Sequence, residues 1–334
     1  MSRLGPKEIP KTIYHYCSLE TFNSIITNKT LRLSDITKSN DSKELIYIRP
    51  FIKEEFLNVY QSEPAQFFKN AVGEGQWQKI TEHYINDWFD ENYRYYSFYV
   101  MCFSNRPDVL SQWRGYANDG NGVSIGLDRE VLMSLLRACA PHPELDIVEY
   151  IERTQKARVK KIATDTIKAI KNELNPEHLK NIKVNPADDS WLMKFFNSAF
   201  DKLFNLAVIC KNPFFSEESE YRIWYRVDKK TVSSEQNDDL IIDGGDASGI
   251  DIKPLAYFKP FHFGTRENSI YSYVDLCFEG AIDQKKALIK EVWTGPKCKA
   301  SKREVEMLLA QHGFPLDENG RIGARTDKSK GSYR

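Results

Sequence analysis

The segment at residues 214–224, FFSEESEYRIW, holds the densest group of side chains that could do chemistry. Side chains alternate between the two faces of a strand, so Glu218, Glu220 and Arg222 are expected on one face. Two carboxylates beside a guanidinium could bind a ribose, stabilise a cationic transition state or orient a nucleophile. The alternative is a solvated strand face with cross-strand ion pairs, which is the commoner arrangement of such residues.

A second candidate is the triplet Tyr14-His15-Tyr16, which lies on the first expected strand. A histidine between two tyrosines can hydrogen-bond to a sugar or a phosphate while the rings offer a stacking surface. The alternative is a histidine that satisfies its hydrogen bonds inside the fold. The other histidines show neither H-x-H nor H-x-x-x-H spacing, so the sequence does not predict a metal site.

A third candidate is the segment that begins at Cys102 and Ser104 and continues to Trp113 and Tyr116. Cys102 could pair with His15 as a nucleophile, but no turn or glycine-rich elbow presents its sulfur, so a buried structural cysteine is favoured. Trp113 and Tyr116 could line a pocket or form the edge of a packed helix. The six cysteines lie far apart, with no C-x-x-C pair, and a zinc ribbon is not predicted.

The composition narrows the class of protein. The chain has 334 residues with 47 Lys and Arg against 47 Asp and Glu, and aromatic residues make up 13%. Aromatic residues at that level exclude charge-rich disorder, and the zero net charge argues against nucleic-acid binding through bulk charge alone. The N-terminus resembles no signal peptide and no apolar run could cross a membrane, so a cytoplasmic location is expected.

Hydrophobic periodicity and capping residues predict the elements that position these candidates. Strands are expected at residues 12–16, 31–34, 95–104, 123–128, 147–151, 220–227, 250–258 and 287–293. Helices are expected after Ser18, at residues 40–58, 76–91, 110–117, 129–137, 154–174 and 188–210, and after Ser301. The helix at 154–174 is basic; it could contact nucleic acid, although a solvated face is the more common role of such a charge run.

The order of these elements predicts the fold class. Strands lie at both ends with helices between them and without regular βαβ alternation, which favours α+β over a doubly wound parallel sheet. We expect a single α+β domain at residues 1–319, with a central, mainly antiparallel split sheet and a helical insertion at about 153–212. Residues 320–334 are basic without apolar anchors and are expected to be a disordered tail.

Several motifs in their joint order resemble a large bacterial family that is catalogued as domain of unknown function 2971. The resemblance covers roughly residues 13–296. It rests on Tyr14-His15-Tyr16, Asn40-Asp41 with Glu44, Cys102-Phe103-Ser104, Trp113-x-x-Tyr116 with Gly120 and Gly122, Phe214-Phe215, Glu218-Ser219-Glu220-Tyr221-Arg222, and Gly295-Pro296.

The first-strand histidine, the aromatic middle segment and the late Glu-x-Glu also resemble ADP-ribosyltransferases more distantly, including toxins that modify nucleic acids. This resemblance implies an enzyme that cleaves NAD and modifies a macromolecular acceptor, such as a toxin or an anti-phage effector. It implies NAD as substrate, no metal, and no covalent nucleophile.

The same resemblance implies roles for individual residues. Glu220 would be catalytic, Glu218 would orient the acceptor, and Arg222 would steady the glutamates or a phosphate. NAD would be bound by His15 at the ribose and by a stacking ring, with the implied cofactor-binding set being His15, Tyr14, Ser104, Trp113 and Tyr116. The Ser-Thr-Ser element of ADP-ribosyltransferases is absent from this sequence, and Cys102-Phe103-Ser104 is only a loose substitute for it.

Two other functions stay open. The protein could be a non-catalytic module that recognises a nucleotide or nucleic acid by stacking, or a metal-independent hydrolase that uses the glutamates or Cys102 with His15. The acceptor and the oligomeric state are left open as well.

Overall fold

The structure is a computed structural model that describes most of the chain. The described residues are 10–39, 41, 43–62, 66–67, 70, 75, 79, 96–139, 142–173, 190–228, 256–259, 261–266, 268–279, 288–314 and 323–332. No helix among them is long and apolar enough to cross a membrane.

Eleven strands form a single sheet within the described part of the chain. They are β1 (Thr12–Cys17), β2 (Thr30–Asp35), β3 (Tyr96–Ser104), β4 (Val123–Asp128), β5 (Glu144–Ile147), β6 (Glu220–Asp228), β7 (Tyr257–Phe258), β8 (His262–Arg266), β9 (Ser269–Cys277), β10 (Ile289–Thr294) and β11 (Arg325–Lys328). The main order is β11-β10-β4-β1-β3-β2-β9-β7, with β6 also on β3, β5 on β6 and β8 on β9. All pairs are antiparallel except β10 with β11.

The sheet divides at β3. One edge of β3 pairs with β6 along its whole length, from Tyr96 opposite Asp228 to Ser104 opposite Glu220. The other edge meets β1 only at Ser104, opposite Tyr14, and meets β2 further along the strand. The two arms β1-β4-β10-β11 and β2-β9 therefore diverge from β3, which confirms the expected α+β fold with a mainly antiparallel split sheet.

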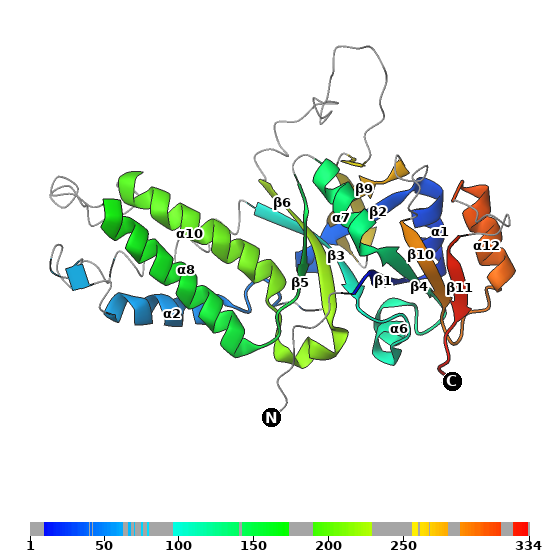
Figure 1. Ribbon diagram of the computed structural model, residues 1–334, viewed down its shortest axis with the longest axis horizontal. Helices are drawn as coiled ribbons and strands as arrows, with labels where there is room; N and C mark the ends of the chain where they lie inside the picture. The colour runs from blue at the N-terminus through cyan, green and yellow to red at the C-terminus, as the bar shows by residue number, and fades with distance from the viewer. Residues whose placement is uncertain are drawn as a thin grey trace, which may run out of the picture.

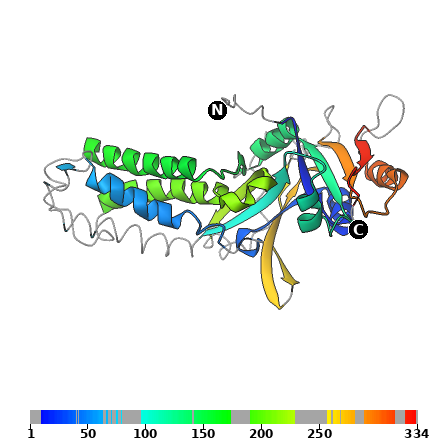
Figure 2. The same cartoon turned by 90° about the horizontal axis from the view of Figure 1, so that it is seen from below.

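Helices cover both faces of this sheet. They are α1 (Leu19–Asn28), α2 (Arg49–Gln61), α6 (Leu110–Tyr116), α7 (Arg129–Ala138), α8 (Glu152–Glu173), α10 (Ser190–Ile209) and α12 (Lys302–Gln311), with short 3-10 turns η1 (Ile36–Lys38) and η5 (Pro213–Glu218). Helices α2, α8 and α10 run together away from the sheet at one end of the molecule, and α1 and α12 lie at the other (Figures 1 and 2).

The alternation of side chains along β3 separates two hydrophobic cores. Met101 and Phe103 face the core formed with α1, α7 and α12, whereas Phe98 and Val100 face the core formed with α2, α8 and α10. The period of two therefore assigns each strand residue to one core. The strand β6 follows the same pattern, because Ile223 joins the first core and Trp224 joins the second.

Local sequence signals explain where several helices begin. Ser18 caps α1 by accepting a hydrogen bond from the backbone N–H of Thr21. Ser301 and Glu304 form the expected capping box at the start of α12. A side-chain acceptor at this position satisfies a backbone donor that has no partner inside the helix, so both predictions of helix starts are confirmed.

Three expectations from the sequence are wrong. The strand expected at 147–151 lies earlier, because β5 ends at Ile147 and only Glu149 beyond it forms an isolated bridge, with Cys210. Residues 43–48 form turns, and α2 begins only at Arg49, followed by a proline that suits the first turn of a helix. The tail is not disordered throughout, because Arg325–Lys328 form β11 on the edge of β10 and Ala324 and Thr326 are buried there. The edge of β10 therefore orders a segment that appears only basic in the sequence, and two small residues of that segment are buried as it pairs.

Two further expectations fall largely outside the described residues. Of the helix expected at 76–91, only residue 79 is described. Of the strand expected at 250–258, only the last three residues are described, and Tyr257–Phe258 form the short strand β7 there.

Candidate functional site

A small cavity opens where β1 and β3 separate. Its volume is about 60 Å³, and its lining comes from β1, β3, α6, the end of η5 and the start of β6. The lining residues are Tyr14, His15, Tyr16, Cys102, Phe103, Gln112, Tyr116, Glu218 and Glu220. The divergence of the two strands thus brings the first-strand histidine and both glutamates, which are far apart in sequence, to one cavity.

His15 is held in a defined orientation by the strand beside it. Its Nδ1 lies 3.0 Å from the backbone carbonyl oxygen of Cys102, and its ring packs edge-on to Phe103. A carbonyl oxygen can only accept, so Nδ1 carries the hydrogen and Nε2 keeps a free lone pair. Burial lowers the pKa of His15, an effect that the bond to Cys102 partly opposes, so the ring is neutral at neutral pH.

Glu220 and Arg222 form the centre of a buried ionic cluster. Arg222 is only 1% exposed and Glu220 only 4%. The guanidinium donates through Nε to Glu220 Oε1 at 2.7 Å, through Nη1 to the carbonyl of Val208 at 2.6 Å, and through Nη2 to Glu44. Glu220 and Arg222 therefore share one face of β6 as expected, whereas Glu218 lies before the strand, at the end of η5. This face of β6 is buried beneath the helical layer and is not solvated.

Lys211 is the second cation of this cluster. Its ammonium lies 2.6 Å from Glu218 Oε2, 3.3 Å from Glu220 Oε2 and 3.7 Å from Glu44 Oε1. Burial alone would lower the pKa of Lys211, but the three carboxylates outweigh burial and raise it. Lys211 is thus charged, because its neighbours replace the water that it loses.

The cluster contains three carboxylates against two cations. Burial would raise the pKa of Glu220, but the charges of Arg222 and Lys211 outweigh burial and lower it, so Glu220 is ionised at neutral pH. In addition, Oε2 of Glu44 is buried without a hydrogen-bond partner among the described residues. The cluster therefore keeps an excess of negative charge next to the cavity, which favours a cationic group there.

Glu218 and Tyr116 form the more open side of the cavity. The Tyr116 hydroxyl donates to Glu218 Oε1 at 2.7 Å, and the side chain of Glu218 is 13% exposed against 5% for Glu220. Burial, followed by the charge of Glu218, raises the pKa of Tyr116, so its hydroxyl keeps its proton. Glu218 is consequently the carboxylate that an incoming molecule would reach first.

The comparison with known families bears on this part of the chain. Residues 112–223 match the family "Protein of unknown function (DUF2971)". The resemblance noted from the motifs is therefore confirmed over that segment. The DUF2971 segment supplies Tyr116, Lys211, Glu218 and Glu220 to the site, while β1 supplies His15 from outside it. No curated protein and no solved structure matches the chain.

Cys102 has the wrong environment for a nucleophile. Its thiol lies beside the carboxylate of Glu220, and burial together with that negative charge raises its pKa well above the ordinary value. His15 contacts the backbone carbonyl of Cys102. A thiol kept protonated in this way is a poor nucleophile, which agrees with the sequence interpretation of a structural cysteine.

Two of the expected NAD-binding residues lie away from the cavity. Trp113 is 1% exposed, packs in a small core with Tyr16 and Trp293, and donates through Nε1 to Asp108 at 2.7 Å. Ser104 is also buried and accepts a bond from the backbone N–H of Arg106. Neither is among the residues that line the cavity, because each satisfies a packing or turn contact instead.

Tyr14 lines the cavity but directs its hydroxyl elsewhere. Burial, followed by the charge of and a hydrogen bond to Glu291, raises the pKa of Tyr14 to about 12. Its ring packs in the same small core as Trp113. Tyr14 therefore forms a wall of the cavity, and of the two expected stacking rings only Tyr116 lines it.

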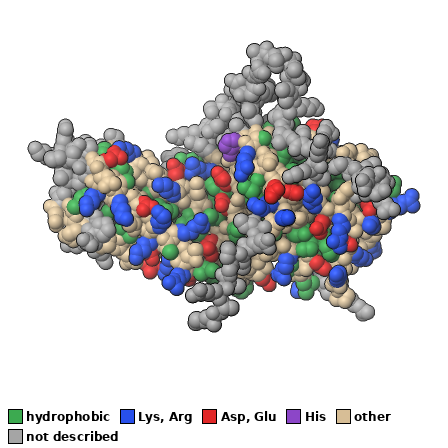
Figure 3. Space-filling view, viewed as in Figure 1, with side chains coloured by type: hydrophobic (Ala, Val, Ile, Leu, Met, Phe, Trp, Pro, Cys, Tyr) green, Lys and Arg blue, Asp and Glu red, His purple; other side chains and the backbone are tan. Residues whose placement is uncertain are grey.

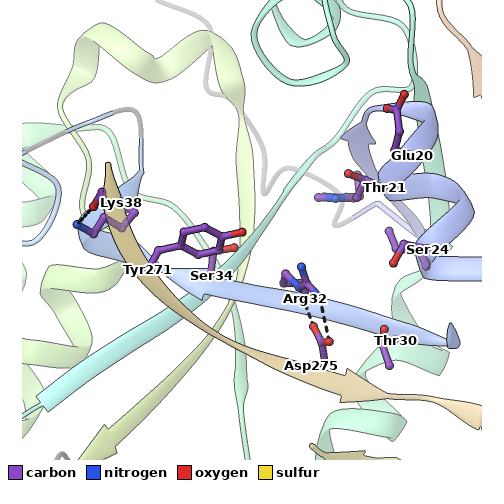
Figure 4. A pocket seen from close by; sticks show the side chains of 12 residues that line it. Glu20, Thr21, Ser24, Thr30, Arg32, Ser34, Lys38, Tyr271 and Asp275 are labelled. Carbon is purple, nitrogen blue, oxygen red and sulfur yellow. Dashed lines mark hydrogen bonds and ion pairs between the residues drawn. The ribbon is translucent and has the colours of Figure 1, made fainter. Parts of the chain in front are cut away.

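A much larger cleft lies between the two arms of the sheet. Its volume is about 840 Å³, and it is lined from α1, β2 and β9, with His15 shared between this cleft and the small cavity. Figure 4 shows Glu20, Thr21 and Ser24 on one side and Ser34, Lys38 and Tyr271 on the other, with Arg32 and Asp275 between them. Hydroxyl-bearing side chains are the commonest kind in this lining, as expected for a site that binds a polar ligand.

The cleft holds two cations with different surroundings. Arg32 donates through Nε and Nη2 to the carboxylate of Asp275 at 2.9 and 3.2 Å and lies 3.6 Å from the centre of the Tyr273 ring. Lys38 donates to the hydroxyl of Ser269 at 3.0 Å and forms no salt bridge with a described acidic residue. Lys38 is thus the cation of the cleft whose charge is not balanced by a direct partner among the described residues.

Sequence reasoning missed two members of the ionic cluster. Lys211 follows the apolar helix α10, and the only signal for it is a single charge after a long apolar stretch. Glu44 has the spacing of a capping-box residue, yet it lies in a turn and bonds to Arg222. Its place in the Asn40-Asp41 motif is the signal that could have indicated a role in the site.

Proposed function

We propose that this protein is an ADP-ribosyltransferase-like enzyme that cleaves NAD and transfers the ADP-ribose to a macromolecular acceptor. The observation that carries the proposal is the single cavity lined by His15 together with Glu218 and Glu220. This is the arrangement that the resemblance to ADP-ribosyltransferases requires, and it depends on the division of the sheet at β3.

The charge of the cavity suits this chemistry. Cleavage of the bond between nicotinamide and ribose leaves positive charge on the sugar, and a nearby carboxylate stabilises that charge in the transition state. Glu220 is ionised because Arg222 and Lys211 hold its pKa low. The third carboxylate of the cluster, Glu44, leaves an excess of negative charge, so the developing cation would be stabilised even though Glu220 is paired.

The two cavities suit different parts of the substrate. The cleft of about 840 Å³ has the size of a typical ligand site, whereas the cavity of about 60 Å³ has room for about two water molecules. The bulk of the dinucleotide would therefore lie in the cleft, with Lys38 near its phosphates. His15 lines both spaces, so the ribose that carries the reacting bond would lie at their junction.

Each side chain then has a role that follows from its surroundings. The free Nε2 of His15 would accept a hydrogen bond from a ribose hydroxyl, and Glu220 would face the developing charge. Glu218, the more exposed carboxylate, would accept the proton of the acceptor. Arg222 and Lys211 are positioning residues, because they act through the glutamates.

The proposal includes a cytoplasmic setting in a bacterium, as a toxin or phage-defence effector. Its support is chemical. All six cysteines are free thiols, as is usual for proteins of a reducing compartment, and NAD is a cytoplasmic metabolite. The raised pKa of Cys102 weighs against the alternative of a thiol hydrolase, and the burial of Trp113 weighs against an aromatic recognition cleft built on that ring.

The experiment is nicotinamide release from NAD by the purified protein, with cell extract and mixed nucleic acids supplied as acceptors. Glu218→Gln is expected to reduce release about a hundredfold or more, because it removes the proton acceptor and keeps the side-chain volume. Glu217→Gln is the matched control, since Glu217 is an exposed neighbour on the same turn, and it should release nicotinamide like the wild type.

A thermal melt of each variant shows whether a loss of nicotinamide release comes from unfolding of the protein. Glu220→Gln leaves two buried cations less compensated and can unfold the protein, so Glu218→Gln is the primary variant. If the folded wild type releases no nicotinamide with any acceptor and its melting temperature is unchanged by millimolar NAD, the proposal is refuted.

A further inference from the structure

The solvent-facing side of α8 is strongly basic in a chain whose overall charge is zero. The helix contains seven Lys and Arg residues and three acidic ones, a net charge of +4. The basic residues are Arg153, Lys156, Arg158, Lys160, Lys161, Lys168 and Lys171. Figure 3 shows Lys and Arg side chains, with fewer acidic ones between them, over the helical end of the molecule.

Most of these charges are not neutralised by the protein. Lys156 pairs with Glu54 and Glu152, and Lys161 pairs with Asp165. The remaining five form no salt bridge with an acidic residue in the described part of the chain; they are Arg153, Arg158, Lys160, Lys168 and Lys171. An excess of positive charge without salt-bridge partners on one helix creates a local field that attracts a polyanion.

Four of these five charges form a stripe along the helix. At about 100° per residue, Arg153, Lys160, Lys168 and Lys171 lie within about 80° of one another around the axis. The centre of this basic stripe lies about 120° around the axis from the centre of the buried side, which includes Val159. A helix of 22 residues is about 33 Å long, which is the span of about ten phosphates at their spacing along one strand of a duplex.

The first turn of α8, where the basic stripe begins, packs against the segment that carries the candidate site; this contact is made by the buried side of the helix, opposite the stripe. Gln155, in the first turn of α8, donates to the backbone carbonyls of Glu149 at 2.6 Å and Lys211 at 2.9 Å. The ammonium of the same Lys211 bonds to Glu218 and Glu220. From this contact α8 runs away from the sheet along the helical end of the molecule (Figures 1 and 2).

Apolar side chains are exposed at the same end of α8. Phe214 is 84% exposed on η5, four residues before Glu218, and Ile151, just before α8, is 63% exposed. Tyr116, whose hydroxyl bonds to Glu218, is 38% exposed. Proteins bind single strands through two features, exposed rings and a row of positive charges. The rings stack on bases, and the positive charges contact phosphates.

We propose that the basic stripe of α8, together with Phe214 and Tyr116, is a docking surface for single-stranded nucleic acid. The polyanion matches the excess positive charge, and a single strand, unlike a duplex, can place an unstacked base on an exposed ring. The identification of the docked strand as the acceptor rests on the proposed function. If that function holds, the bound end of the strand lies beside Glu218.

The test is the fluorescence anisotropy of a labelled single strand of about 16 nucleotides, DNA or RNA, titrated with the full chain without NAD. If the four cations of the basic stripe contact phosphates, affinity falls with a log–log salt slope of about −2.8, which is about a fiftyfold loss between 50 and 200 mM salt. The triple variant Lys160→Gln, Lys168→Gln, Lys171→Gln leaves one cation of the stripe, so it should reduce the slope to about −0.7 and weaken binding about tenfold or more at 50 mM salt.

A control variant loses the same number of positive charges as the triple variant, but on another part of the surface. Lys299→Gln, Lys302→Gln, Lys328→Gln removes three exposed lysines near α12 and β11, and it should bind like the wild type. Phe214→Ala should weaken binding of the single strand about tenfold while leaving the salt slope unchanged, because stacking contributes no counterion release.

Several results would overturn the docking surface. These are no binding at low salt, equal weakening by the two triple variants, tighter binding of a duplex of the same length, or binding to vesicles rich in anionic lipid in place of the oligonucleotide. The measurement needs no catalysis, so it is separable from the proposed function. If the strand binds through α8 but the protein does not cleave NAD, the docking surface is supported and the transferase proposal is refuted.

Discussion

Replacement of Arg222 by methionine removes the centre of the ionic cluster and keeps most of the side-chain volume. The guanidinium bonds to Glu220 and Glu44, and both glutamates are almost fully buried. Removing one partner of a buried ion pair leaves an uncompensated buried charge, which costs about 3–5 kcal/mol of unfolding free energy. For 334 residues this corresponds to a fall of about 4–7 °C in the melting temperature.

The cost should depend on pH in a defined direction. In the wild type the pKa of Glu220 is lowered, since the charges of Arg222 and Lys211 outweigh burial. A lowered pKa in the folded state stabilises the protein above the pKa of the unfolded chain, about 4.3, and this stability is lost as the pH falls. In the variant, burial is opposed only by Lys211 and by the hydrogen bond with Cys102, so the pKa of Glu220 in the folded variant is higher than in the wild type and the stability of the variant falls as the pH rises. The difference between wild type and variant is therefore larger at about pH 8 than at about pH 5.

The assay is urea unfolding followed by circular dichroism at both pH values. Arg226→Met is the matched control, because Arg226 lies further along the same strand and pairs with the exposed Asp201. It should cost no more than about 1 kcal/mol at either pH. Equal destabilisation by the two variants, or a cost of Arg222→Met that grows towards acid pH, would refute the account of the cluster.

Three further predictions concern single side chains. Because burial and Glu220 raise its pKa, the thiol of Cys102 should react with iodoacetamide about tenfold or more slowly in the folded than in the urea-unfolded protein, and equal rates by mass spectrometry would contradict this. Ser301→Ala should lower the unfolding free energy by about 1 kcal/mol through loss of the capping box, and an unchanged urea midpoint would count against it. Asp108→Ala should cost about 1–3 kcal/mol, because it leaves the buried indole N–H of Trp113 without its acceptor, and a neutral result in the same assay would contradict that contact.

Alternating patterns and caps were sufficient to predict most of the elements. The strand with Glu220 and Arg222 has the expected face, and helices begin at Ser18 and Ser301 as their side chains indicate. These signals are local, because each depends on residues within one or two turns of chain. The face of β6 that carries the charges is nevertheless buried, and no local signal in β6 reports the helices that cover it.

The site itself depends on contacts between distant segments. Glu44 reaches Arg222 from a turn before α2, and Lys211 reaches the same cluster from just after α10. The neighbours of Trp113 in sequence suggest an exposed stacking ring, yet Asp108 and the core around Tyr16 hold it inside. Burial and pairing of this kind follow from tertiary packing, which one sequence does not specify residue by residue.

The central claim is that the reacting end of NAD lies between His15 and the two glutamates. The most direct measurement is a crystal structure of the protein with an NAD analogue whose glycosidic bond is made to carbon, so that it cannot be cleaved. The account predicts the nicotinamide ribose at the junction of the cleft and the small cavity, with a hydroxyl at Nε2 of His15 and the carboxylate of Glu218 or Glu220 facing the anomeric carbon. An analogue bound elsewhere on the chain, or no bound analogue at millimolar concentration, would contradict it.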